Sequence, residues 1–358
     1  MKDSRQAALS KQKPTRSSWK AAATKGWLQP GTLLAIAGVA ALAALPTVLA
    51  RVPKGEYYLH ILILILLYAY LATAWNILGG FAGQHSLGHS IFLGAGAYAS
   101  TILFVTWRVS PWLGMWAGAA VAALLGWFLG YLCFRYGLRG PYFALVTIAL
   151  AEAALYLVTN IKALGGARGL EIPWIGNSLA WMQFSSKAGY YYIALGLTAA
   201  GIVLSAWLNR RRFGYYLVAV RENEDAAEAV GVNLLGMKVR AAVLSAALTA
   251  IGGTLYAQYF TYINPRSVFG EMPSIQILLF AIIGGLGTVW GPAIGALVLV
   301  PIAELVRAEL GGSIAGAPLL LYGAILMVVM LFMPKGIVGL ADALRQRLHS
   351  KSGEGGGG

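Results

Sequence analysis

Long apolar runs separated by short polar segments repeat along most of the chain. The runs hold few or no charged side chains and cover residues 31–50, 57–84, 90–107, 111–134, 141–161, 188–209, 241–264, 272–303 and 310–334. Most of them approach the ~20 residues that a helix needs to cross a bilayer. The pattern therefore predicts an all-α integral membrane protein built as a polytopic helical bundle.

The run 272–303 is too long for one membrane span. It is interrupted by a cluster of helix-breaking residues, Gly284, Gly285, Gly287, Gly291 and Pro292. Glycine and proline both weaken or end helices. We therefore divide this run into two short spans that meet near Trp290, which makes about ten transmembrane helices with Gly-rich broken segments.

Composition agrees with a membrane protein. Hydrophobic residues make up 58% of the 358 positions and charged residues only 11%, whereas soluble domains carry roughly a quarter charged residues. Cys133 is the one cysteine, so no disulfide can form within the chain.

Basic residues indicate the orientation in the membrane. Most of the 27 Lys and Arg residues gather in four regions, namely 1–30, 135–139, 210–240 and 335–351. With ten spans these regions share one side, which the positive-inside rule assigns to the cytosol. We expect a basic cytosolic N-terminal tail (1–30), a permease domain (31–340) and a cytosolic C-terminal tail (341–358). The net charge of +14 then reflects topology and lipid contact, and we predict no nucleic-acid partner.

A cleaved signal peptide is the alternative for the first apolar run. The run ends in Val48-Leu49-Ala50, which resembles a small-residue cleavage site. The basic tail before it is unusually long for a signal peptide. Cleavage would also place the two termini on opposite sides, so we favour a retained span.

Catalytic motifs are missing from the sequence. It contains no G-x-x-x-x-G-K-[ST], HExxH, CxxC or G-x-S-x-G pattern, so we predict no catalytic residues and no nucleotide bound by this chain. His85 and His89 stand four residues apart, a spacing at which a helix could present both rings to a metal. No carboxylate lies between them, so we favour hydrogen bonding to neighbouring groups and predict no metal.

Two glycine-interrupted segments lie at corresponding places in the two halves of the chain. Residues 76–89 and 284–292 carry them, and broken helices in two halves are typical of a solute pathway between inverted repeats. We predict a translocation role for Gly83, Gln84, Ser86, Gly88, His89, Gly284, Gly285 and Gly287. The alternative for any single glycine is close helix packing.

Ionisable residues within apolar runs need partners or water. Glu152 lies near the middle of run 141–161, and we expect it to form a helix-to-helix hydrogen bond or to line the pathway. Glu304 and Arg307 are three residues apart, so they can pair on one helix face.

The loop 209–238 is the most informative polar segment. Arg210, Arg211 and Arg212 precede a short charged helix in which Asn223 can cap the N-terminus, Glu224 and Asp225 complement the helix dipole, and Gly231 can end the helix. Its small apolar residues are Ala226, Ala227, Ala229 and Val230, and Arg221 and Glu222 stand at its entry. We predict that this helix docks in a groove of a cytosolic partner. A solvated helix that touches only this chain is the alternative.

At these residues the chain resembles a known family. Asp225-Ala226-Ala227, followed after three residues by Gly231, is similar to the EAA loop of bacterial ABC-transporter permeases, with Asp in place of Glu and without the usual downstream Ile-x-Leu-Pro. Residues 83–98, 139–147, 220–233, 284–295 and 333–337 resemble, in order, segments of the LivM-type branched-chain amino acid permeases. The resemblance covers roughly residues 57–340. His85 departs from it, because the family usually has an apolar residue there.

The resemblance implies a permease subunit of an ATP-driven importer in the bacterial inner membrane. It implies pairing with a second, related permease, two cytosolic ATPase subunits that bind ATP and Mg²⁺ and dock on residues 221–231, and an extracytoplasmic solute-binding protein. Branched-chain amino acids are the expected solutes, with urea, amides and aromatic acids as alternatives. Two other classes need no such partners: a secondary transporter or channel, which would need ion-coupling groups in the membrane, and a membrane-embedded enzyme, which would need a catalytic constellation.

Overall fold

A computed structural model describes residues 42–310 of the chain, together with 320, 323–325, 327, 331 and 336–339. Eight helices in this part are long and apolar enough to cross a membrane: Gly55–Phe81, Ser90–Trp107, Pro111–Arg135, Pro141–Asn160, Lys187–Asn209, Leu234–Phe260, Pro265–Gly284 and Gly291–Ala308. They match eight of the ten predicted spans. The other two, 31–50 and 310–334, fall largely outside the described residues. Of the first, the described part 42–49 is helical.

The chain divides into two units, with the boundary between Val52 and Pro53. In the second unit, α4 (Gly55–Asn76) continues into a π-helix, η1 (Ile77–Phe81), and is followed by α5 (Ser90–Trp107), α6 (Pro111–Arg135), α7 (Pro141–Asn160) and α8 (Lys187–Asn209). The short helices α9 (Arg212–Glu222) and α10 (Glu224–Ala229) come next. The long α11 (Leu234–Phe260), α12 (Pro265–Phe269), α13 (Glu271–Gly284) and α14 (Gly291–Leu310) complete the described fold.

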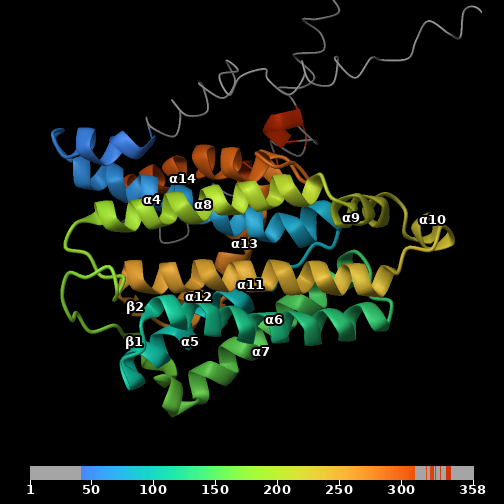
Figure 1. Ribbon diagram of the computed structural model, residues 1–358, viewed down its shortest axis with the longest axis horizontal. Helices are drawn as coiled ribbons and strands as arrows, with labels where there is room; N and C mark the ends of the chain where they lie inside the picture. The colour runs from blue at the N-terminus through green and yellow to red at the C-terminus, as the bar shows by residue number, and fades with distance from the viewer. Residues whose placement is uncertain are drawn as a thin grey trace, which may run out of the picture. The chain divides into compact units, whose positions relative to one another are not determined.

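Helix α11 lies at the centre of this unit and packs against α4, α5 and α6 (Figure 1). Small residues allow these helices to approach closely, which is how helices associate where lipid removes the hydrophobic drive. A Cβ on Gly96 of α5 would lie 2.1 Å from the Ala250 carbonyl oxygen of α11, and one on Gly253 of α11 would lie 2.2 Å from the Leu93 carbonyl oxygen of α5. The α5–α11 contact is thus backbone against backbone.

The two predicted helix breaks are present. Helix α13 ends at Gly284 and α14 begins at Gly291, which confirms the division of the long apolar run. The other break consists of η1 and of residues 82–89, which are mostly irregular until α5 begins at Ser90. A π-helix at the end of a long helix often marks a functional site.

Successive spans alternate in direction, so their connections form two ends. One end carries α9, α10 and both helix breaks, as shown by the contacts of Arg221 and Glu224 described below (Figure 1). The opposite end carries the short 3₁₀ helices η2 (Lys162–Leu164) and η3 (Gly166–Arg168). There β1 (Leu170–Glu171) pairs antiparallel with β2 (Tyr262–Ile263), in the register Leu170 to Ile263.

The backbone contact between α5 and α11 yields a stability prediction. Gly96→Ala should lower the free energy of unfolding by about 1–3 kcal/mol, because the added methyl group overfills a tight helix interface. Gly196 of α8 is the matched control, since a Cβ there would meet no atom within 4 Å. Gly196→Ala should be neutral or stabilising by up to ~1 kcal/mol. Thermal unfolding of the purified protein measures both; equal melting temperatures for the two variants would contradict this packing.

Candidate functional site

The loop between α8 and α11 folds as two short helices joined at Asn223. The Asn223 Oδ1 accepts a hydrogen bond from the Ala226 backbone N–H at 2.9 Å, and Glu224 and Asp225 occupy the first turn of α10. Gly231 follows the helix with φ of +89°, a left-handed conformation that glycine adopts without strain. The predicted cap and the predicted helix end are both confirmed.

The prediction that Ala227 belongs to the docking face is wrong. Ala227 is only 3% exposed, packed within its own chain where α10 meets α9 and α11. Ala226 and Ala229 are exposed, and Val230 is 81% exposed. A six-residue helix has one face on the protein, and the spacing of the small residues did not show which one. The surface available to a partner is therefore Ala226, Ala229 and Val230, with Asp225 and Glu228 beside them.

Glu224 connects α10 to three other parts of the chain. Its Oε1 lies 2.5 Å from the Lys238 ammonium of α11 and accepts a hydrogen bond from the Gln84 amide at 3.3 Å. Its Oε2 forms an ion pair with Arg139 Nε at 2.8 Å. The Glu224 and Lys238 side chains are 15% and 5% exposed, so this pair is largely shielded from water. Arg139 also reaches Asp225 Oδ1 at 3.4 Å.

Arg221, at the end of α9, reaches the two helix breaks. Its Nη1 donates to the Gly80 carbonyl oxygen at 3.0 Å, and its Nη2 lies 2.7 Å from Glu222 Oε1. A Cβ on Gly287, in the second break, would lie 2.2 Å from the same Nη1. Gly287 has φ of +69°. A side chain at position 287 would therefore displace the guanidinium from this place.

Asn76 joins the two breaks directly. Its Oδ1 accepts a hydrogen bond from the Gly287 backbone N–H and its Nδ2 donates to the Thr288 carbonyl oxygen, both at 2.9 Å. Gly80 completes the contact, because a Cβ there would lie 2.6 Å from the Gly287 nitrogen. The two glycine-interrupted segments, far apart in sequence, therefore meet beside Arg221. We call Arg221, Asn76, Gly80 and Gly287 the break clamp.

Of the remaining predicted pathway glycines, Gly88 and Gly284 are packed against backbone and Gly83 is packed against the Arg221 side chain. A Cβ on Gly83 would lie 2.7 Å from Arg221 Cγ, one on Gly88 would lie 2.2 Å from the Thr147 carbonyl oxygen, and one on Gly284 would lie 1.7 Å from the Gly291 carbonyl oxygen. Gly285 has φ of +133°. These positions fit the close-packing alternative. A translocation role for the segments as a whole stays a prediction.

Both ring nitrogens of His89 form hydrogen bonds with hydroxyl groups. Nδ1 lies 3.0 Å from Ser86 Oγ and Nε2 lies 2.8 Å from Ser245 Oγ. The ring is fully buried. Ser86 in turn accepts a hydrogen bond at its carbonyl oxygen from Trp75 Nε1. The described residues contain no group of three or more His, Cys, Asp or Glu side chains that could hold a metal ion.

Glu152 lies half-buried on α7. Within the described residues, no hydrogen bond or ion pair to its carboxylate is found, so the expected helix-to-helix hydrogen bond is not seen there. Helix α7 is also one of the least buried spans. A pathway role for Glu152 stays a prediction.

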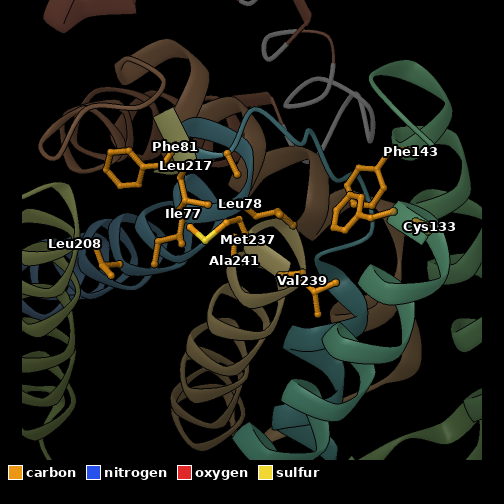
Figure 2. Close-up of a cluster of buried hydrophobic side chains, with 13 residues drawn as sticks. Ile77, Leu78, Phe81, Cys133, Phe143, Leu208, Leu217, Met237, Val239 and Ala241 are labelled. Carbon is orange, nitrogen blue, oxygen red and sulfur yellow. The ribbon is translucent and has the colours of Figure 1, made fainter. Parts of the chain in front are cut away.

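Apolar packing ties the loop helices to the ends of the spans. Figure 2 shows Leu217 of α9 among Ile77, Leu78 and Phe81 of the first break and Met237 of α11. Phe143 of α7 and Cys133 of α6 lie in the same buried cluster. Displacing α9 would therefore displace the ends of several membrane helices, because close-packed interiors transmit strain.

The sequence had marked only part of this site. Arg139 and Lys238 fall in basic regions that predict topology, and Asn76 falls in a glycine-interrupted segment, so the sequence does not indicate their contacts. Their partners are distant in the chain: Asn76 and Gly287 are 211 residues apart. A polar residue three positions before a glycine pair is the one local signal, and it does not identify a partner.

Eight apolar spans, with a polar site that joins their connections at one end, define a polytopic membrane protein. The chain belongs to the family described as branched-chain amino acid transport system / permease component, which matches residues 57–334.

Curated relatives agree with this assignment. The chain is 27% identical to the high-affinity branched-chain amino acid transport system permease protein LivM of Escherichia coli (strain K12), over 81% of this chain and 71% of that protein. It is 24% identical to the permease protein LivH of Salmonella typhimurium, over 76% of this chain and 91% of that protein. A probable LivM of Methanocaldococcus jannaschii is 25% identical over 61% of this chain. No solved structure matches the chain significantly.

The buried ion pair of α10 can be tested by neutralising its acid. Glu224→Gln should lower the free energy of unfolding by roughly 3 kcal/mol, because Lys238 then lacks its counter-ion away from water. Glu228→Gln is the control on the same helix, since Glu228 is exposed, and it should change stability by less than ~0.5 kcal/mol. Adding Lys238→Met to Glu224→Gln should restore most of the loss. Thermal unfolding of the purified permease measures all four proteins, and equal stability of the two glutamine variants would refute the pairing.

Proposed function

We propose that this chain is a permease subunit of an ATP-driven importer of branched-chain amino acids, and that residues 221–231 are its coupling element. The observation that carries the proposal is the exposed small-residue surface of α10 on a helix whose other contacts lead directly to the membrane helices. In this proposal two ATPase subunits, which bind ATP and Mg²⁺, press on that surface. The breaks at 77–89 and 285–290 receive the movement.

The charge distribution supports a cytosolic location for this end. Arg135, Arg139, Arg210 and Arg240 all lie at the ends of spans that meet α9 and α10. Short loops rich in Lys and Arg face the cytosol, where ATP is available. The chain is then a multi-pass protein of the bacterial inner membrane with both termini inside.

A groove beside α10 supports contact with another protein. It has a volume of about 240 Å³ and is lined by residues of α9, the end of the α10 segment and the start of α11, among them Tyr216, Val230, Asn233 and Arg240. Aromatic and Arg residues are enriched in protein interfaces. The exposed Val230 lies at its edge, so one partner surface could cover both the groove and α10.

The mechanism follows from the contacts of α9 and α10. A push on α10 is passed through Glu224 to α11 and to the α6–α7 loop, and a push on α9 is passed through Arg221 to both breaks. Because these connections are ion pairs, hydrogen bonds and close packing, the loop moves with the helix ends as one body. Rigid-body movement of this kind switches transporters between inward-open and outward-open states.

The position of Glu152 supports pairing with a second permease subunit. A carboxylate on a lightly buried helix would face lipid in an isolated chain, which is expensive. We propose that a second, related permease subunit covers this face of α7. An extracytoplasmic binding protein would deliver the solute at the opposite end, near β1 and β2.

Branched-chain amino acids are proposed because LivM and LivH, which the chain resembles along most of its length, are named for their transport. Urea, amides or aromatic acids are the alternatives that uptake assays would reveal. A secondary transporter or channel would not need the exposed α10 surface.

Enlarging an exposed residue of α10 tests the docking. Ala229→Trp should leave the permease folded, because this side chain is exposed. It should lower the affinity for the ATPase subunits roughly five- to 150-fold, since overfilling a packed interface costs about 1–3 kcal/mol. The measurement is the ratio of ATPase to permease subunits after co-purification.

Ala163→Trp is the control, because Ala163 is also exposed but belongs to η2 at the opposite end. It should leave the subunit ratio unchanged. An unchanged ratio together with normal ATP-dependent uptake in the Ala229→Trp protein would overturn the docking proposal.

A further inference from the structure

A polar cavity lies at the end of the helix bundle opposite to α10. Its volume is about 230 Å³, and five helices converge on it, α4, α11, α12, α13 and α14. On α4 it is lined by His60, Leu64 and Tyr68, which are four residues apart and so share one helix face. The break clamp and the α10 contacts contribute no residue to this cavity.

The cavity carries charges of both signs. Glu304 and Arg307 of α14 form the predicted pair, with Arg307 Nη1 2.7 Å from Glu304 Oε1. The other carboxylate oxygen of Glu304 accepts no hydrogen bond from the part of the chain that the structure describes. Arg266 of α12 is exposed, and among the described residues no carboxylate lies within ion-pair distance of it. One carboxylate oxygen and one guanidinium are therefore available to a ligand.

The remaining wall is suited to a small apolar group. Leu64, Phe260, Met272 and Pro273 contribute aliphatic and aromatic surface, and the Tyr68 hydroxyl donates to Gln276 Oε1 at 2.9 Å. Sites for drug-sized ligands measure about 300–1,000 Å³. A cavity just below that range fits a solute smaller than a drug-sized ligand.

We propose that this cavity is an outer binding site for a zwitterionic α-amino acid with an aliphatic side chain. Arg266 would bind the α-carboxylate, Glu304 the α-ammonium, and Leu64 and Phe260 the side chain. A guanidinium and a carboxylate recognise these two groups through charge-assisted hydrogen bonds. The proposal rests on the proposed transport function and adds the place where the solute is held before it passes the membrane.

Equilibrium binding of radiolabelled L-leucine to the purified permease–ATPase complex, without ATP and without binding protein, tests the site. Two competitors each lack one charge: 4-methylpentanoate has no ammonium and isopentylamine has no carboxylate. In the wild-type complex both should compete at least tenfold less well than L-leucine, because hydrogen bonds to charged groups contribute about tenfold or more each.

Each substitution should weaken only the probes that carry the charged group bound by the substituted residue. Arg266→Gln should weaken L-leucine and 4-methylpentanoate at least tenfold and leave isopentylamine unchanged. Glu304→Gln should weaken L-leucine and isopentylamine and leave 4-methylpentanoate unchanged. Arg168→Gln is the control, because Arg168 is an exposed arginine at the same end that does not line the cavity; it should bind all three probes as the wild type does.

Two results would overturn the proposal: no saturable L-leucine binding to the wild-type complex, or binding in Arg266→Gln and Glu304→Gln that equals that of Arg168→Gln. Because no ATP is used, a failure of the coupling proposal leaves this binding assay unaffected. Conversely, ATP-dependent L-leucine uptake that is insensitive to both substitutions would reject the cavity and retain the transport function.

Discussion

Helix ends inside a membrane protein leave backbone carbonyl and N–H groups without helical partners, and this structure depends on how they are satisfied. Arg221 donates to the Gly80 carbonyl of the first break, and Asn76 pairs with the backbone of Gly287 and Thr288 in the second. An unsatisfied polar group in such a setting costs several kcal/mol. Arg221, from the loop between α8 and α11, therefore satisfies the backbone of the first break, and Asn76 satisfies the backbone of the second.

This arrangement ties the proposed coupling element, residues 221–231, to the membrane helices. α10 is held by Glu224 to Lys238 and Arg139, and α9 is anchored by Leu217 in the apolar cluster of Figure 2. A movement imposed on the exposed residues of α10 would therefore be passed to α11 and to the loop between α6 and α7. At the helix breaks a membrane helix can change direction while the backbone hydrogen bonds within the helices on either side are kept.

Local chemistry and periodicity predicted much of the fold. Apolar length predicted the eight described spans, the glycine and proline cluster predicted the break before Gly291, and Asn223 and Gly231 predicted the limits of α10. The unpredicted features all depend on tertiary contacts. The burial of Ala227, the partners of Glu224 and the meeting of the two breaks depend on residues that are up to 212 positions apart. No local pattern specifies such pairs.

The most direct test of the account replaces Arg221, because the guanidinium is the link between loop and breaks. Arg221→Met keeps the apolar stem and removes the donor to Gly80, and Arg212→Met removes an exposed arginine at the start of α9 as a control. The measurement is solute taken up per ATP hydrolysed by the complex in proteoliposomes. The account predicts that Arg221→Met retains its ATPase subunits and hydrolysis while uptake per ATP falls about tenfold or more. A ratio equal to those of the wild type and Arg212→Met would contradict it.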